Sequence, residues 1–157
     1  MTSPHPGGAR WETRHRAREA ALRALYLIAV GHVPSDAALD LVAGAAADDD
    51  AVALEPEARA LAERLAGGAW EAREDLDALI APHCVNWRIE RLAVLDHLVL
   101  RLAVHEWLTE KATPPKVVLS EALELARVYS GDAAVRFVNG VLDAVYHRLR
   151  REGRIID

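Results

Sequence analysis

Apolar residues recur at intervals of three and four along almost the whole chain, and no stretch alternates strictly between apolar and polar residues. The first spacing places apolar side chains on one face of an α-helix, whereas strict alternation would indicate a β-strand. The composition also favours helices. The chain has 30 Ala and 21 Leu, which favour helices, but only 4 Thr, which favours strands. The sequence therefore predicts an all-α fold.

Glycines, prolines and capping residues divide the chain into about seven predicted helices around one core, a single-domain bundle. A disordered N-terminal lead is expected over 1–11 and one helical domain over 12–153. Residues 44–53 are expected to form an acidic connection. The predicted helices cover 12–30, from Ser35 to about 43, 56–80 as one long helix, 86–92, 94–110, from Pro115 to about 130, and from an N-cap at Asp132 to Gly153. The helix over 94–110 is apolar on most faces, which indicates a central position.

The charge is unevenly distributed along the chain. The formal net charge is −5, but residues 1–31 carry five Arg and two acids, whereas residues 36–81 carry three Arg and twelve acids. Phosphates respond to the local field, so the basic N-terminal segment fits a nucleic-acid partner. The excess of 17 Arg over two Lys also favours an RNA partner, because Arg binds phosphate bidentately and stacks on bases. A general preference for Arg over Lys is the alternative explanation.

No arrangement typical of a catalytic or metal centre occurs in the sequence. Ser120 lacks the flanking glycines of a hydrolase nucleophile, and no Gly-rich loop opens a helix. His105-Glu106 matches the start of the zinc-protease signature, but Thr109 stands where the second His is required. Cys84 is the single cysteine, which excludes a disulfide framework. We therefore expect no enzymatic activity, no cofactor and no metal.

Membrane insertion is not expected, because no apolar run approaches the ~20 residues that cross a bilayer. The first ten residues also lack the apolar segment of a secretory signal. The predicted location is the cytoplasm.

Basic residues crowd the start of the first predicted helix, at Arg14, His15, Arg16 and Arg18. Positive charge at a helix N-terminus opposes the helix dipole, so these residues do not serve helix stability. The functional interpretation is a phosphate-contacting patch for single-stranded RNA. A solvated charged helix end is the alternative.

Four motifs, in order, resemble the NusB family of transcription antitermination factors. The most specific is the run from Arg136 to Asp143, RFVNGVLD, which is close to the family's KFVNGVLD signature. The other three are RHRARE at 14–19 leading to ALY at 24–26, LRLAVHE at 100–106, and PPKVV at 114–118 followed by EALELA at 121–126.

The resemblance implies an all-helical, non-catalytic protein that binds single-stranded boxA-type leader RNA together with NusE, a ribosomal protein of the small subunit. In the family this pair supports processive transcription of rRNA operons as part of an RNA polymerase antitermination complex. The RNA-binding residues implied are Arg14, His15, Arg16, Arg18 and Tyr129, with Arg127 and Lys116 as weaker candidates. The partner-binding residues implied are Tyr26, Glu90 and Asp96.

This chain departs from the family pattern at Ser120, where the family commonly has Asn, and at two further places. His15 replaces a usual Arg, which makes that contact pH-dependent. Ala133 and Ala134 stand where the family has an acidic residue and a Ser, so RNA contacts of the loop 130–134 are in doubt.

Two other functions are compatible with the sequence. One is an RNA-binding domain related to rRNA cytosine methyltransferases, which would require a cofactor-binding α/β unit that these 157 residues do not show. The other is a helical scaffold or homodimer that binds no RNA, which sedimentation and a gel shift would distinguish.

Overall fold

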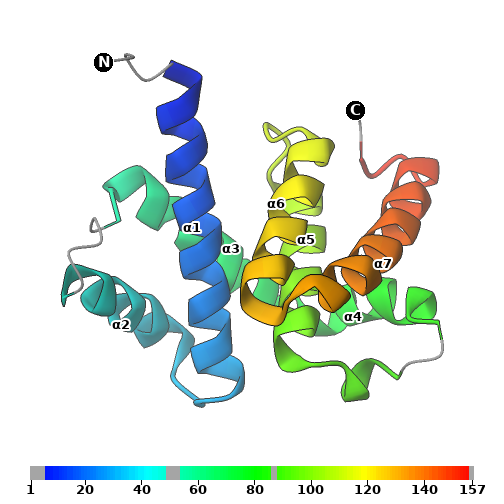
Figure 1. Ribbon diagram of the computed structural model, residues 1–157, viewed down its shortest axis with the longest axis horizontal. Coiled ribbons are helices and arrows are strands. Elements are labelled where there is room, and N and C mark those ends of the chain that lie inside the picture. The colour runs from blue at the N-terminus through cyan, green and yellow to red at the C-terminus, as the bar shows by residue number, and fades with distance from the viewer. Residues whose placement is uncertain (1–5, 49–53, 86–87, 156–157) are drawn as a thin grey trace. The chain divides into compact units, whose positions relative to one another are not determined.

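The computed structural model describes residues 6–48, 54–85 and 88–155, and within them the chain forms seven α-helices and two short 3₁₀ turns without a strand (Figure 1). This confirms the predicted all-α class. Contacts divide the chain into two compact units, Met1–Gly68 and Ala69–Asp157. The α-helices are α1 (Pro6–Ala29), α2 (Ser35–Asp48), α3 (Pro56–Glu71), α4 (Arg73–Ile80), α5 (Val94–Thr109), α6 (Pro115–Ser130) and α7 (Asp132–Arg151).

The first unit is built on close packing between α1 and α2. Leu25 and Ile28 of α1 are buried, as are Leu39 and Val42 of α2. Small side chains let helix axes approach toward the short end of the usual ~8–10 Å range. The α1 residues that are small enough for such an approach are Ala17, Ala20, Ala21 and Ala24, all buried.

A tight turn ends α1 after Ala29, close to the stop that Gly31 predicted. A Cβ on Gly31 would lie 2.8 Å from the carbonyl oxygen of Leu27, so a larger residue would collide with the last turn. His32 takes the left-handed conformation, with φ of 54°, which reverses the chain direction. The Val33 amide then donates to the Leu27 oxygen at 3.1 Å.

The predicted disordered lead is wrong for residues 6–11, because α1 begins at Pro6; residues 1–5 lie outside the described residues. Proline is well tolerated at the first position of a helix. Trp11 stacks on His15 one turn later, with ring centroids 5.3 Å apart, and such pairs stabilise helices. These two effects outweigh the poor helix propensity of Gly7 and Gly8.

Other boundaries also differ from prediction. Helix α2 continues to Asp48, so the expected connection over 44–53 begins too early, and 49–53 lie outside the described residues. Alanine-rich sequence favours helix there despite the acidic residues that follow. The predicted helix over 86–92 reduces to a 3₁₀ turn at Ile89–Arg91, with 86 and 87 not described. Arg88 before it is extended, which prevents a longer helix.

The single helix predicted over 56–80 is interrupted at Ala72, where ψ is 9°. The chain passes helically through Gly67 and Gly68, as predicted. Arg73 explains the break, because its Nη1 donates to the Trp70 carbonyl at 2.8 Å and its guanidinium lies 4.2 Å from the Trp70 ring centroid. A side chain that satisfies a terminal carbonyl stabilises the helix end.

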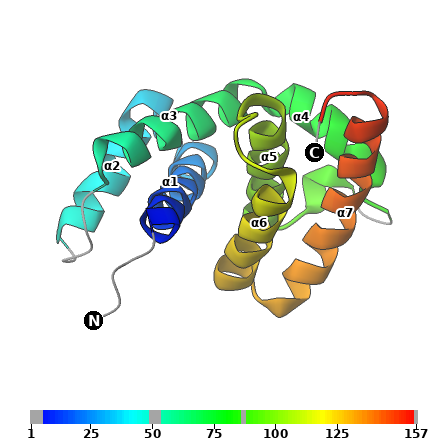
Figure 2. The same ribbon diagram turned by 90° about the horizontal axis from the view of Figure 1, so that it is seen from above.

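The second unit surrounds α5, which packs against α4, α6 and α7 and so confirms its predicted central position in this unit. Leu98, Leu102 and Trp107 are among its buried residues, and Trp107 Nε1 donates to the Pro115 carbonyl at 3.1 Å. Gly131, with φ of 97°, joins α6 to α7, which turns back alongside it (Figure 2). Gly131 rather than Asp132 is the N-cap of α7, which corrects that prediction.

Candidate nucleic-acid interface

The basic residues of α1 do not share one environment. Arg16 is exposed, Arg14 and His15 are half-buried, and Arg18 is only 2% exposed. A helix turns about 100° per residue, so Arg14 and Arg18 lie on a different side from Arg16. The predicted cluster is therefore a sequence cluster that the helix divides into buried and solvent-facing members.

Arg18 lies among the buried residues, next in sequence to Ala17, which is completely buried. An Arg side chain contributes packing through its methylenes as well as charge through its head. A buried guanidinium is not presented to a ligand at the surface, so the expected RNA contact of Arg18 does not agree with its position in this structure.

Trp11 is a residue that the sequence analysis missed, because it fell in the expected disordered lead. Its side chain is 49% exposed, and its ring lies nearly parallel to that of His15, at an interplanar angle of 10°. His15 Nε2 lies 4.0 Å from Glu19 Oε2. The signal was present in the sequence, because an aromatic residue four positions before His15 suggests a stacked pair on one helix face. His15 covers one face of the Trp11 ring, and the exposed part of Trp11 remains accessible to a planar ligand.

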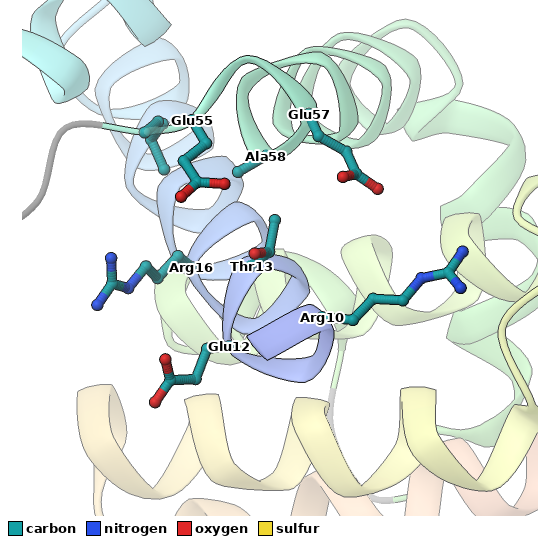
Figure 3. A pocket seen from close by; sticks show the side chains of 8 residues that line it. Arg10, Glu12, Thr13, Arg16, Glu55, Glu57 and Ala58 are labelled. Atoms are coloured by element: carbon teal, nitrogen blue, oxygen red, sulfur yellow. The ribbon is translucent and has the colours of Figure 1, made fainter. Parts of the chain in front are cut away.

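A pocket of about 480 Å³ lies between the first turns of α1 and the start of α3 (Figure 3). Thr13 lies between Arg10 and Arg16 on α1, while Glu55 and Glu57 reach toward α1 from the beginning of α3. The remaining lining residues are Glu12, Leu54 and Ala58. Arg10, like Trp11, was missed because its segment was expected to lack structure.

The charged side chains of this pocket differ from other charges in the same unit. Within the described part of the chain, none of Arg10, Arg16, Glu12, Glu55 and Glu57 forms a side-chain ion pair or hydrogen bond. Elsewhere in the unit such pairs are present, as Arg23 pairs with Glu19 at 3.4 Å and Arg59 pairs with both Asp40 and Glu63. The pocket therefore presents both signs of charge to a ligand.

The RNA-binding candidates on α6, in the second unit, differ in their exposure and in whether they already have a partner. Arg127 is exposed, but its Nε donates to Glu124 Oε2 at 3.1 Å and its Nη2 donates to the other oxygen. Tyr129 is half-buried and already engaged in an interaction. Lys116 is exposed in the first turn of α6. Ser130, Asp132 and Ala133 are exposed in the altered loop.

The predicted partner-binding residues present polar groups at or near the surface. Tyr26 on α1, in the first unit, is 42% exposed. Glu90 is exposed, and Asp96 is half-buried in the first turn of α5, where a carboxylate is stabilised by the helix dipole. The Asp96 Oδ1 atom is buried and accepts no hydrogen bond from the described residues.

A half-buried polar cluster joins α4 to α5. Arg101 donates from Nε and Nη2 to the two oxygens of Asp77, at 2.8 and 2.6 Å, and His97 Nε2 lies 2.7 Å from Oδ1. Burial raises the pKa of Asp77, but hydrogen bonds from Arg101 and His97 outweigh burial and hold that pKa below its ordinary value. An ionised carboxylate only accepts, so His97 donates from Nε2. This cluster uses its charges to fix two helices together.

Burial also shifts the pKa values of two side chains that are adjacent in sequence, His83 and Cys84. It lowers the pKa of His83, with added repulsion from Arg148 and Arg151, and it raises the pKa of the Cys84 thiol, with a smaller contribution from Asp77. A buried thiol with a raised pKa is a poor nucleophile. Among the described residues, no three His, Cys, Asp or Glu side chains gather where they would hold a metal ion.

Fold and site together define a class, an all-α protein whose leading helix presents arginine and a stacked aromatic pair to solvent. None of the described helices is long and apolar enough to span a bilayer. The comparison with protein families gives the particular identity, since residues 15–147 match the family model described as the NusB family. The chain belongs to the NusB family.

Individual relatives agree with this assignment. The chain is 37% identical over 140 residues to the transcription antitermination protein NusB of Symbiobacterium thermophilum, covering 88% of this chain and 92% of the relative. Its fold is similar to that of T. maritima NusB, with a TM-score of 0.75, 30% identity and coverage of 94% and 93%. It is also similar to a chain in the crystal structure of antitermination factors NusB and NusE in complex with dsRNA, with a TM-score of 0.75, 27% identity and coverage of 87% and 98%.

Proposed function

We propose that this chain is a cytoplasmic transcription antitermination factor that binds single-stranded boxA-type leader RNA together with NusE and so supports processive transcription of rRNA operons. In this proposal the RNA-binding domain extends from Pro6 to Gly153 and acts without catalysis as part of an RNA polymerase antitermination complex. The observation that carries the proposal is the exposed guanidinium of Arg16, which has no ion-pair partner among the described residues, on the same helix as the half-exposed Trp11 ring.

The chemistry of α1 supports an RNA ligand. Arg10 and Arg16 are accessible cations for phosphates, and Trp11 offers a π-face for an unpaired base. Arg14 and His15 are half-buried, and Arg14 lies on a different side of the helix from Arg16, so both are weaker candidates for RNA contact than Arg16. Arg18 has a structural role instead, because its side chain is buried.

Relatives support both proposed ligands. A similar solved chain is NusB bound with NusE and double-stranded RNA. Stacking on Trp11 requires an unpaired base, so we expect this chain to distinguish single-stranded from double-stranded RNA.

An aromatic residue of the first unit and two acidic residues of the second support the protein partner. Tyr26 combines an apolar ring with a hydroxyl, which is typical of residues that dominate interface energetics. Glu90 and Asp96 would attract a basic surface and orient it. Of the two carboxylates, Glu90 is exposed and can meet a basic side chain of NusE directly, whereas the Oδ1 atom of Asp96 is buried.

RNA titration with and without NusE tests the proposal. Fluorescently labelled boxA RNA, single-stranded or annealed to its complement, is titrated with the chain alone and with the chain and NusE. We expect weak, salt-sensitive binding by the chain alone and tighter binding of the single strand by the pair.

Charge reversal on α1 then locates the RNA surface. We expect Arg16→Glu to weaken single-strand binding by the pair about tenfold, because it removes one phosphate contact and adds repulsion. Arg23→Glu is the matched control, since Arg23 is an exposed arginine of the same helix that pairs with Glu19. Equal effects of the two variants, or no joint assembly with RNA and NusE, would contradict the proposal.

A further inference from the structure

The pocket between α1 and α3 has the size and the charge pattern of a site for one nucleotide base. Its volume of about 480 Å³ lies within the range of ~300–1,000 Å³ that small-ligand sites occupy. Its uncharged lining residues are Thr13, Leu54 and Ala58. Arg10 and Arg16 extend on opposite sides of Thr13 (Figure 3). Glu55 and Glu57 reach across from the start of α3.

Both signs of charge are available to a ligand at this site. The guanidiniums of Arg10 and Arg16 and the carboxylates of Glu12, Glu55 and Glu57 make no side-chain ion pair or hydrogen bond within the described chain. An acidic peptide would meet three carboxylates here, and a basic peptide would meet two guanidiniums. A nucleotide suits both groups, because its phosphate is anionic whereas its base carries N–H donors.

The bases differ in how well they match a carboxylate and a guanidinium at once. Guanine presents adjacent N1–H and N2–H donors, which suit the two oxygens of a carboxylate, and adjacent O6 and N7 acceptors, which suit a guanidinium. Adenine has no second acceptor beside N7, cytosine has a single amino group, and uracil has only the N3–H donor. Guanine is therefore the base that satisfies both kinds of side chain bidentately.

We propose that this pocket binds one unpaired guanine of the RNA, with Glu55 or Glu57 accepting from N1–H and N2–H and with Arg10 or Arg16 donating to O6 and N7. This inference rests on the proposed RNA-binding function and adds a base preference to it. It also gives Glu55 and Glu57, at the start of α3, a role at the RNA surface.

Single-guanine RNA tests the inference on the full chain with NusE. The probes are short single-stranded oligouridines that carry one central guanosine, inosine, 7-deazaguanosine, adenosine or uridine, measured by fluorescence anisotropy at low salt. We expect guanosine to bind about tenfold more tightly than uridine or adenosine. Inosine lacks the N2 amino group and 7-deazaguanosine lacks the N7 acceptor, so each should lose a large part of that advantage.

Substitutions on the protein separate base reading from a general charge effect. Glu55→Gln combined with Glu57→Gln should remove the guanosine preference while leaving uridine binding equal or slightly tighter, because two negative charges are lost. Glu71→Gln, at an exposed glutamate of α3 outside the pocket, is the matched control and should keep the preference.

Three results would overturn the inference. Equal affinity for guanosine and uridine while RNA still binds would remove the base preference and leave the proposed function intact. Weaker binding of every probe by the double variant would show that the two glutamates only support the fold. Absence of binding to all probes would overturn the proposed function and this inference with it.

Discussion

Arginine serves different purposes in the first turns of α1 and at the contact between α4 and α5. Arg101 on α5 is 14% exposed and donates two hydrogen bonds to Asp77, so its charge is satisfied inside the protein. Arg16 on α1 is exposed and forms no ion pair within the described residues. A charge that already has a partner holds the fold together, whereas an accessible charge without one is available to a ligand. Arg101 is therefore expected to contribute to stability, and Arg16 is the residue that we propose for RNA contact.

The largest expected effect separates Arg18 from Arg16 on the same helix. We expect Arg18→Ala to lower the free energy of unfolding by about 3 kcal/mol, because removing a buried charged side chain leaves its surroundings unpaired and unfilled. Arg16→Ala should change it by less than about 0.5 kcal/mol, as for ordinary surface positions. Urea denaturation followed by circular dichroism measures both, and similar values for the two variants would contradict the distinction.

The next effect concerns the paired cluster between α4 and α5. Asp77→Asn should lower the free energy of unfolding by about 2 kcal/mol, because Arg101 loses a charged acceptor while half-buried. RNA affinity of the folded variant should stay unchanged. Asp75→Asn is the control, since Asp75 is exposed on the same helix, and it should be nearly neutral. A large loss of RNA affinity in Asp77→Asn would show that this cluster is not purely structural.

A smaller effect is expected at the aromatic pair of α1. Trp11→Ala should weaken binding of single-stranded RNA about tenfold, because stacking of one base contributes roughly 1–3 kcal/mol. Trp11→Phe should retain most of the affinity, since a ring remains. Val30→Ala, at an exposed apolar residue directly after the end of α1, serves as the control. Unchanged affinity in Trp11→Ala would mean that RNA contacts α1 through its cations alone.

The smallest effect is a loss of stability in acid that arises in the second unit. Burial lowers the pKa of His83 in the folded protein, so protonation favours the unfolded chain, and stability should begin to fall as pH drops through the ordinary histidine value of 6.5. The lowered pKa of Asp77 acts in the same direction near its ordinary value of 3.8. Urea midpoints measured across this range should decrease toward acid, and His83→Gln should remove the first part of the decrease.

Prediction from sequence succeeded where local pattern decides structure. The helices from Val94 to Arg151 lie close to their expected limits, because Pro115 and Gly131 mark the breaks and each helix has a continuous apolar pattern. The N-terminal limit failed, since Pro6, Gly7 and Gly8 suggest disorder while the stacked Trp11 and His15 favour helix. That error also hid Arg10 and Trp11 from the list of candidate residues.

The helical class, the order of the helices and the resemblance to the NusB family all follow from local properties of the chain, namely periodicity, breakers and motifs. Which charges are buried, paired or accessible depends instead on how the helices pack. Arg14, Arg16 and Arg18 look equivalent in sequence, yet only packing buries Arg18 and leaves Arg16 exposed. Likewise, Glu55 and Glu57 are separated from Arg10 by more than forty residues, and only the fold places them around one pocket. Burial and pairing depend on contacts between distant residues, which no local pattern encodes.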